Sequence, residues 1–277
     1  MRESHSFPGL AQARGVLAAL LVSWVVVAGG LGGCVSNRPI ERKEPPLASE
    51  PADLDRRARV RLELAAAYFG RGQSATALDE VRQALLARPD LPEAHNLRGL
   101  ILASMNEPAQ AEDSFRRALQ LNGRDADTLH NYAWFLCQQR RYKEADAQFQ
   151  VAQGIPNYPG LPRTLMAQGI CQARNNQWAD AERSLSSAYE LDPGSPATAV
   201  NLAEVLFRRG DLERARFYTR RVMAQDPQPG AQTLWLAIRI EHKLNQPAQV
   251  QTLGTQLRQR FPQAPETLLF ERGRFDD

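Results

Sequence analysis

The fold of this chain is decided by residues 129–152, which read LHNYAWFLCQQRRYKEADAQFQVA. Apolar residues recur at helical spacing on both sides of the polar stretch QQRR, which predicts two amphipathic helices joined by a sharp turn. In the second helix, Ala145 is followed four residues later by Phe149 and three residues after that by Ala152. The small residues would let the two helices approach closely, and Phe149 would fill the gap toward the next pair.

The same spacing returns five more times, with its chemistry degraded in the last copy. The first positions of the six triads are separated by 34, 34, 36, 34 and 35 residues. This period and spacing resemble the tetratricopeptide repeat, whose hairpins must stack because none can bury its apolar face alone. The resemblance implies an all-α fold, a right-handed superhelical solenoid of about six tetratricopeptide helix hairpins. The five further triads are Ala77/Val81/Ala84, Ala111/Phe115/Ala118, Ala181/Leu185/Ala188, Ala215/Thr219/Val222 and Val250/Gly254/Leu257.

The repeats are expected to occupy residues 58–264, and a capping tail is expected at 265–277. Four prolines near repeat ends would stop helices, because proline cannot continue a helix and restricts the residue before it. The segment 155–162, IPNYPGLP, carries three prolines and a glycine, so it cannot be helical throughout and should bend the solenoid. The expected repeats are 58–91, 92–125, 126–155, 162–195, 196–229 and 231–264, and the four prolines are Pro89, Pro193, Pro227 and Pro262.

Residues 1–33 differ in composition from the rest of the chain, and we interpret them as a lipoprotein signal peptide. Arg2 and Arg14 precede a charge-free apolar run of thirteen residues at 16–28, too short for a membrane span of roughly 20 residues. The sequence LGGC at 31–34 resembles the bacterial lipobox, which implies cleavage before Cys34 and a covalent lipid on that residue. The alternatives are an uncleaved short anchor and a cysteine that occurs at this place by chance. Residues 34–57, rich in proline and mixed charge, are expected to form a disordered tether.

Composition favours a binding protein over an enzyme. Lys plus Arg number 34 against 31 Asp plus Glu, a formal charge of +3, so we expect no nucleic-acid partner. No catalytic motif is present, and neither His95 nor His130 lies in a zinc-binding pattern, so we expect no metal, no other cofactor and no small-molecule substrate. Cys137 and Cys171 are expected to be free thiols with diverging directions, and a disulfide is the alternative.

In a repeat of this kind the first helices line a concave surface, and its positions in the first three repeats are mostly apolar. A contiguous stripe of this composition favours a binding groove. The alternative is that neighbouring repeats or the tether cover these residues. The candidate groove residues are Leu62, Ala66, Phe69, Asn96, Leu100, Ala103, His130 and Trp134, continued by Cys137, Met166, Ile170 and Ala173. In the last two repeats the corresponding surface is more basic and mixed, with Glu204, Phe207, Arg208, Trp235, Arg239, His242 and Lys243.

Three stretches give a more specific resemblance. The run at 129–145, the break before the fourth repeat, and LWLAIRIEHKL at 234–244 followed by LRQRFPQAPE at 257–266 closely resemble the PilF/PilW family of type IV pilus biogenesis. The resemblance implies a pilotin, a non-enzymatic lipoprotein anchored at the periplasmic face of the outer membrane by Cys34. Such a protein binds subunits of a PilQ-like secretin and promotes their outer-membrane localisation and multimerisation. The alternative is a generic tetratricopeptide scaffold lipoprotein that serves another cell-envelope assembly machine.

Overall fold

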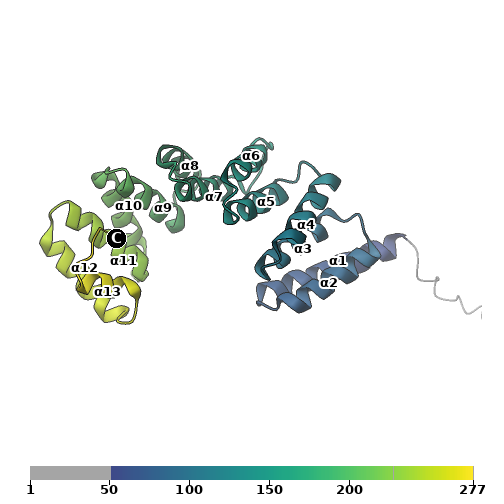
Figure 1. Cartoon of the computed structure of the whole chain (residues 1–277), viewed down its shortest axis with the longest axis horizontal. Coiled ribbons are helices and arrows are strands. Elements are labelled where there is room, and N and C mark those ends of the chain that lie inside the picture. The colour runs from purple at the N-terminus through teal and green to yellow at the C-terminus, as the bar shows by residue number, and fades with distance from the viewer. Residues whose placement is uncertain (1–50, 227, 277) are drawn as a thin grey trace, which may run out of the picture. The chain divides into compact units, whose positions relative to one another are not determined.

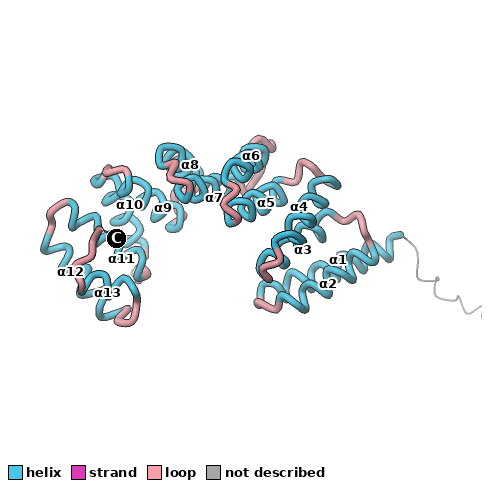
Figure 2. The backbone as a smooth tube through the Cα atoms, viewed as in Figure 1, coloured by secondary structure: helices cyan, strands magenta, loops and turns pink. Residues whose placement is uncertain are grey.

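The computed structural model describes residues 51–226 and 228–276, and within those ranges the chain consists of helices and connecting turns without strands (Figures 1 and 2). The predicted signal peptide, Cys34, tether residues 34–50 and Pro227 lie outside the described residues. The helices are α1 (Pro51–Gly70), α2 (Ser74–Ala87), α3 (Pro92–Ser104), α4 (Pro108–Leu121), α5 (Ala126–Gln138), α6 (Tyr142–Gln153), α7 (Leu161–Arg174), α8 (Trp178–Leu191), α9 (Pro196–Arg208), α10 (Leu212–Gln225), α11 (Ala231–Lys243), α12 (Pro247–Arg260) and α13 (Pro265–Glu271).

Helices α1 to α12 pair in chain order into six hairpins, and α13 follows the last of them (Figure 1). The second helix of each hairpin packs against the first helix of the next. Successive first helices also approach one another within 8 Å between Cα atoms, whereas successive second helices in the described residues do not. The first helices therefore form the more closely packed side of the stack. This arrangement confirms the all-α prediction of six tetratricopeptide hairpins.

The packing triads lie where their spacing predicted. Ala145, Phe149 and Ala152 are fully buried at 0% exposure, and the corresponding residues of the other hairpins are buried as well. Two first helices carry a glycine opposite the large residue of their own second helix. A Cβ atom on Gly99 would lie 2.7 Å from the Phe115 ring, and one on Gly169 would lie 2.6 Å from Leu185. These hairpins close tightly because the first helix offers no side chain there.

The turn inside each hairpin contains one residue with positive φ, the left-handed region that most side chains avoid. Glycine occupies this place in two hairpins, asparagine in three and Arg140 in one. Their spacing repeats that of the packing triads, 34, 34, 36, 34 and 35 residues. The sixth repeat, which lacks a turn glycine, therefore keeps the same turn through an asparagine. The six residues are Gly72, Asn106, Arg140, Asn176, Gly210 and Asn245.

The expected tether does not extend as far as residue 57, because α1 already begins at Pro51. Asp53 lies in the first helical turn and forms ion pairs with Arg56 and Arg57. Acidic residues in a first turn and i,i+3 or i,i+4 ion pairs both stabilise a helix start. Asp55 also pairs with Arg88 at the end of α2, which ties the added turns to the first hairpin.

The break between the third and fourth repeats is present, since α6 ends at Gln153 and α7 begins at Leu161. Tyr158 organises the connection: its hydroxyl lies 3.0 Å from the Asp127 carboxylate and 3.3 Å from the Thr164 hydroxyl. Pro162 stands in the first turn of α7, where the missing N–H costs no helical hydrogen bond. The proline-rich insertion is thus a structured connection anchored to α5 and α7.

Candidate functional site: the first-helix groove

The eight predicted groove residues lie on α1, α3 and α5, the first helices of the first three hairpins. Ala66 is exposed, and Asn96 is half-buried. Five others are half-buried and pack with part of their surface against the core of these hairpins: Leu62, Phe69, Leu100, Ala103 and Trp134. The structure thus brings seven of the eight to an accessible surface, although several also serve the core.

Polar groups connect these first helices along the groove. The side-chain amide of Asn131 on α5 donates to the Asn96 side-chain oxygen on α3, at 3.1 Å. The guanidinium of Arg174 at the end of α7 lies 4.9 Å from the centre of the Trp134 ring, a cation–π arrangement. Arg174, which the sequence pattern did not single out, therefore covers one face of the most prominent aromatic side chain of the predicted groove.

Of the eight residues, His130 is the one that the structure buries, and Cys137, which continued the predicted groove, is buried as well at 1% exposure. His130 is 8% exposed, its Nδ1 lies 2.9 Å from the Thr164 hydroxyl, and its ring meets Phe149 edge-on. Burial, with the nearby Arg163 guanidinium, lowers the pKa of His130 to about 4. His130 is therefore a neutral residue packed between the third and fourth hairpins, against Phe149 of α6 and Thr164 of α7.

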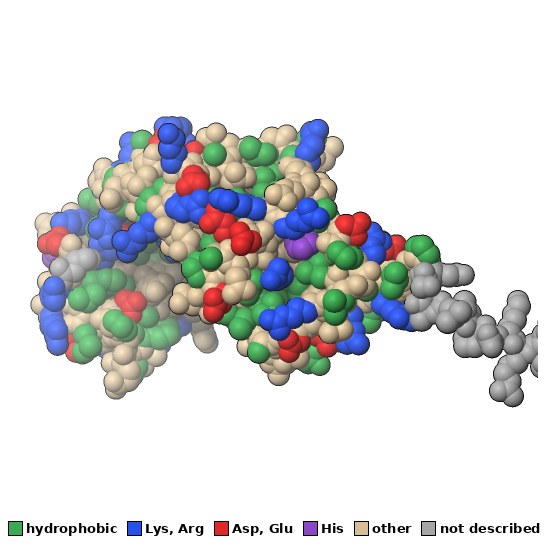
Figure 3. All heavy atoms as spheres, turned by 45° about the vertical axis from the view of Figure 1, so that its right-hand side comes forward, with side chains coloured by type: hydrophobic (Ala, Val, Ile, Leu, Met, Phe, Trp, Pro, Cys, Tyr) green, Lys and Arg blue, Asp and Glu red, His purple; other side chains and the backbone are tan. Residues whose placement is uncertain are grey.

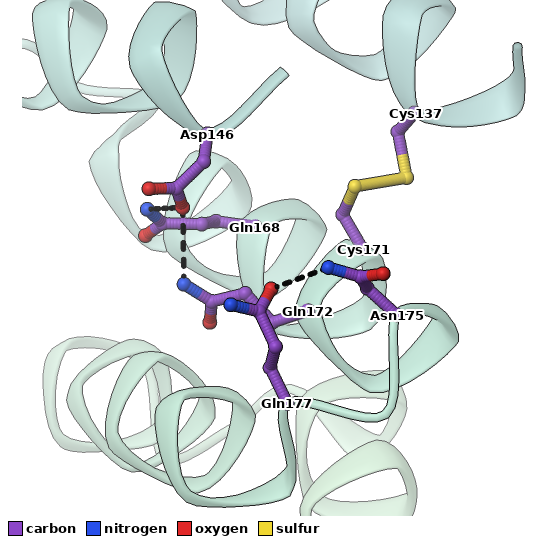
Figure 4. The surroundings of a disulfide bond; sticks show 7 residues. All are labelled: Cys137, Asp146, Gln168, Cys171, Gln172, Asn175 and Gln177. Carbon is purple, nitrogen blue, oxygen red and sulfur yellow. Dashed lines mark hydrogen bonds between the residues drawn. A yellow bond between two sulfur atoms is a disulfide. The ribbon is translucent and has the colours of Figure 1, made fainter. Parts of the chain in front are cut away.

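The prediction of free thiols was wrong, because Cys137 and Cys171 form a disulfide between α5 and α7 (Figure 4). Cys137 lies eight residues before its triad alanine, Ala145, and Cys171 lies ten before Ala181. The expectation that the two cysteine side chains point in different directions rested on this offset. Neighbouring first helices meet through opposite faces, however, so residues at different repeat positions are the ones that face each other. Their Cα atoms lie 5.8 Å apart, within the range of disulfides.

A polar network surrounds this junction. The Asp146 carboxylate on α6 accepts hydrogen bonds from the side-chain amides of Gln168 at 2.7 Å and Gln172 at 3.1 Å, both on α7 (Figure 4). Ser184 on α8 donates to Gln172 at 2.8 Å. These contacts hold the third hairpin to the fourth through hydrogen bonds and a covalent link in addition to apolar packing.

In the sixth hairpin the equivalent surface is covered by the chain itself. The tail after α13 returns over α11, where Phe275 stacks on the Trp235 ring with centroids 5.8 Å apart and on His242 at 4.1 Å. The Nε of Arg239 donates to the Phe275 carbonyl at 3.2 Å, and Asp276 pairs with Lys243. The tail residues Phe275 and Asp276 therefore lie over the first helix of the sixth hairpin.

Other kinds of site find no support in the described residues. No group of three or more His, Cys, Asp or Glu side chains in residues 51–226 and 228–276 could hold a metal ion. The Nε2 atom of His95 lies 2.9 Å from the Pro89 carbonyl oxygen. None of the helices that the structure describes has the length and apolar character needed to cross a membrane. On the face seen in Figure 3, Lys and Arg side chains are interspersed with Asp and Glu.

Comparison with known proteins gives a consistent picture. Models of the tetratricopeptide repeat family match residues 58–83, 92–125 and 172–238. The type IV pilus assembly protein PilF of Pseudomonas aeruginosa is 28% identical over 246 residues, which cover 89% of this chain and 95% of PilF. A structure from the functional characterisation of Pseudomonas aeruginosa PilF superposes with a TM-score of 0.71 at 26% identity, covering 79% of this chain and 99% of that one. The crystal structure of PilW, a widely conserved type IV pilus biogenesis factor, superposes with a TM-score of 0.72 at 27% identity, covering 76% and 96%.

Proposed function

Because the chain belongs to the tetratricopeptide repeat proteins of type IV pilus biogenesis, we propose that it is a pilotin: an outer-membrane lipoprotein that binds secretin subunits and promotes their localisation and multimerisation. The observation that carries the proposal is the alignment with PilF over 95% of the length of that protein. A match of this extent spans the whole repeat array, whereas the match with cellulose synthase operon protein C of Xanthomonas axonopodis covers 56% of this chain and 11% of that protein. The tetratricopeptide scaffold then acts by holding a partner chain.

The secretin contact is proposed to lie on the first-helix groove of hairpins one to three. Leu62, Phe69 and Leu100 present partly exposed apolar surface there, and Ala66 is exposed between Leu62 and Phe69 on α1. A row of partly exposed apolar side chains on successive helices suits an amphipathic helical or extended peptide. Trp134, backed by Arg174, supplies an aromatic anchor of the kind that dominates interface energies.

The membrane attachment is proposed to run through Cys34. Two or more acyl chains, at about 0.8 kcal/mol per buried methylene, anchor a protein stably to a bilayer. Anchoring would confine the repeats to the membrane surface and raise the effective concentration of secretin subunits where the ring assembles. The Cys137–Cys171 disulfide supports export, because disulfides persist in oxidising compartments such as the periplasm.

The groove assignment is tested with a pair of single substitutions on α1. Ala66→Arg places a long charged side chain in the groove, and Ala67→Arg places the same side chain on the next residue, which is also exposed but points elsewhere on the helix. With purified secretin subunits on a biosensor, Ala66→Arg should weaken binding at least tenfold and Ala67→Arg should not. The Leu62→Asp, Phe69→Asp double variant should abolish binding while far-ultraviolet circular dichroism keeps its helical signal. Equal binding by all variants would refute this face.

The anchor and the identity of the partner need separate experiments. A Cys34→Ala protein should leave the outer-membrane fraction, and its retention there would overturn the lipid assignment. Affinity capture from envelope extracts with residues 51–277, read by mass spectrometry, should recover the secretin. Recovery of another envelope assembly machine without any secretin would instead favour a general scaffold lipoprotein.

A further inference from the structure

A second binding surface lies at the other end of the repeat array, on α11 and the neighbouring α9. Its residues were expected to line the groove of the last repeats, and the chain's own tail covers part of them in this structure. The tail is directed there by Gly273, whose φ of +63° turns the chain back after α13. The N–H of Arg274 then donates to the Leu269 carbonyl at 3.0 Å, which fixes the reversal.

The contacts of the tail define three chemical features. The Phe275 ring stacks on the Trp235 and His242 rings, with interplanar angles of 26° and 22°. The Phe275 main-chain carbonyl accepts a hydrogen bond from the Arg239 guanidinium, so one backbone position of an extended segment is recognised. The Asp276 carboxylate pairs with the Lys243 ammonium group, and this hydrogen bond holds the pKa of Asp276 below its usual value. The surface therefore selects an aromatic side chain followed by an acid.

The described tail residues, 272–276, fill this surface only in part. Beside Asp276, a cavity of about 410 Å³ extends toward α9 and is lined by Phe207, Arg208, Arg209 and Leu212. The guanidinium of Arg239 lies 4.5 Å from the centre of the Phe207 ring and forms the wall between the cavity and the tail. A longer segment that continued past the acid would place further side chains in this partly apolar space, where Arg208 and Arg209 are already paired with Glu204 and Glu182. Such a segment would make contacts that the described tail residues do not make.

The tail is also held loosely enough to leave. The side chain of Asp276 is 76% exposed and that of Lys243 is 45% exposed, so their ion pair contributes little. Phe275 is only half-buried, in contrast to the 9% exposure of Phe270 on α13. Displacement of the last few residues would therefore uncover Trp235, His242 and Lys243 at the loss of one contact with α13, the edge-on contact of the Phe275 ring with Phe270 at 6.2 Å between centroids.

We propose that the α9–α11 surface binds an extended peptide segment of a partner protein in which an aromatic residue precedes an acidic one, and that Phe275 and Asp276 occupy this site in the free protein. The tail acts as a built-in competitor. A tethered competitor has an effective concentration of the order of millimolar, so a partner must exceed it in affinity or make the additional contacts in the cavity. The site is separate from the groove of hairpins one to three and does not depend on the proposed secretin contact.

The test uses the full repeat region and the synthetic peptide RGRFDD, which copies residues 272–277. Binding is followed by nuclear magnetic resonance shifts of the tryptophan indole N–H groups. The variant Phe275→Ala, Asp276→Asn should bind the peptide at least tenfold more tightly than the wild type, because its own tail no longer competes. Adding Lys243→Glu to this variant should remove the binding. Leu268→Ala, an exposed change on α13 away from the tail contacts, is the matched control and should behave as the wild type.

Three results would overturn the proposal. Binding of the peptide RGRADD or RGRFNN to the opened variant as tightly as RGRFDD would remove the aromatic or the acidic requirement. Equal peptide binding by the opened variant and the wild type would show that the tail does not compete. A concentration-dependent dimer of the wild type in light scattering, lost in the opened variant, would show that the tail serves a second copy. The thermal unfolding of each variant controls for loss of fold.

Discussion

Cys137 and Cys171 are separated by 34 residues and join two neighbouring first helices, α5 and α7, at a Cα distance of 5.8 Å. The link spans the one junction where the repeat period is lengthened to 36 residues, between Ala145 and Ala181. An insertion at this place could weaken the stacking on which a solenoid depends. The disulfide and the amide network around Asp146 hold the same junction, so covalent and polar contacts add to the packing where the repeat is irregular.

Removal of the disulfide should destabilise this junction. For a closed loop of 34 residues, chain-entropy arguments give a stabilisation of about 3 to 4 kcal/mol. The Cys137→Ser, Cys171→Ser variant should therefore unfold at a lower temperature than the oxidised protein, and hydrogen exchange should become faster in α5 and α7 first. The reduced wild type should match the variant. Identical unfolding curves with and without reductant would contradict the role of this link.

The buried His130 predicts a loss of stability in mild acid. The pKa of His130 is about 4 in the folded protein and 6.5 in an exposed histidine. Between these pH values His130 is therefore protonated in the unfolded chain but neutral in the folded chain. The contribution of His130 to the free energy of unfolding is full above pH 6.5. It falls as the pH drops toward 4, by at most about 1.4 kcal/mol per pH unit. The nearby Arg163 favours the neutral ring and Asp127 opposes it.

The His130→Gln variant keeps a polar side chain near Thr164 but cannot titrate. Its melting temperature should fall less than that of the wild type between pH 6.5 and 4.5, when both are followed by circular dichroism. Carboxylates elsewhere titrate in both proteins, so the difference between the two curves isolates His130. Parallel curves would mean that His130 takes up its proton at the same pH in the folded and unfolded states.

The repeat pattern could be predicted from the sequence because each triad residue has one role. Ala145 and Phe149 are buried whatever the angle between hairpins, so their spacing alone identifies them. The groove could be predicted only in part. Leu62 and Leu100 keep an accessible surface, but His130 is buried by its contacts with Phe149 and Thr164, which its repeat position alone does not give.

Contacts between segments that are distant in the sequence could not be predicted, for a related reason. The Cys137–Cys171 link requires the facing sides of two helices, which the repeat position of either residue does not give. The contact of Phe275 with Trp235 joins an irregular tail to a helix 40 residues earlier in the chain. A signal was nevertheless present, since an aromatic residue followed by acid at the end of a capping segment matches the aromatic and basic residues of 234–244.

Replacement of Arg140 by glycine should stabilise the protein. Arg140 occupies the left-handed position of its hairpin turn with φ of 60°, where the other hairpins use glycine or asparagine. A residue with a Cβ atom costs roughly 1 to 2 kcal/mol in this conformation, and glycine escapes that cost but is more flexible when unfolded. Arg140→Gly should therefore raise the free energy of unfolding by about 0.5 to 1 kcal/mol. Arg140→Ala removes the same side chain and keeps the strain, so it should give no gain in urea denaturation.

Gly254 controls the attachment of the last helix. A Cβ atom at this position would lie 1.9 Å from the Phe270 ring, so Gly254→Ala must push Phe270, and with it α13, away from α12. Overpacking of this kind costs about 1 to 3 kcal/mol, and limited proteolysis should cleave the segment after Arg260 much faster than in the wild type. Gly230→Ala makes the same chemical change where nothing lies within 4 Å, so it should leave the rate unchanged. If Gly254→Ala also left the rate unchanged, α13 would be held by contacts other than the Phe270 ring.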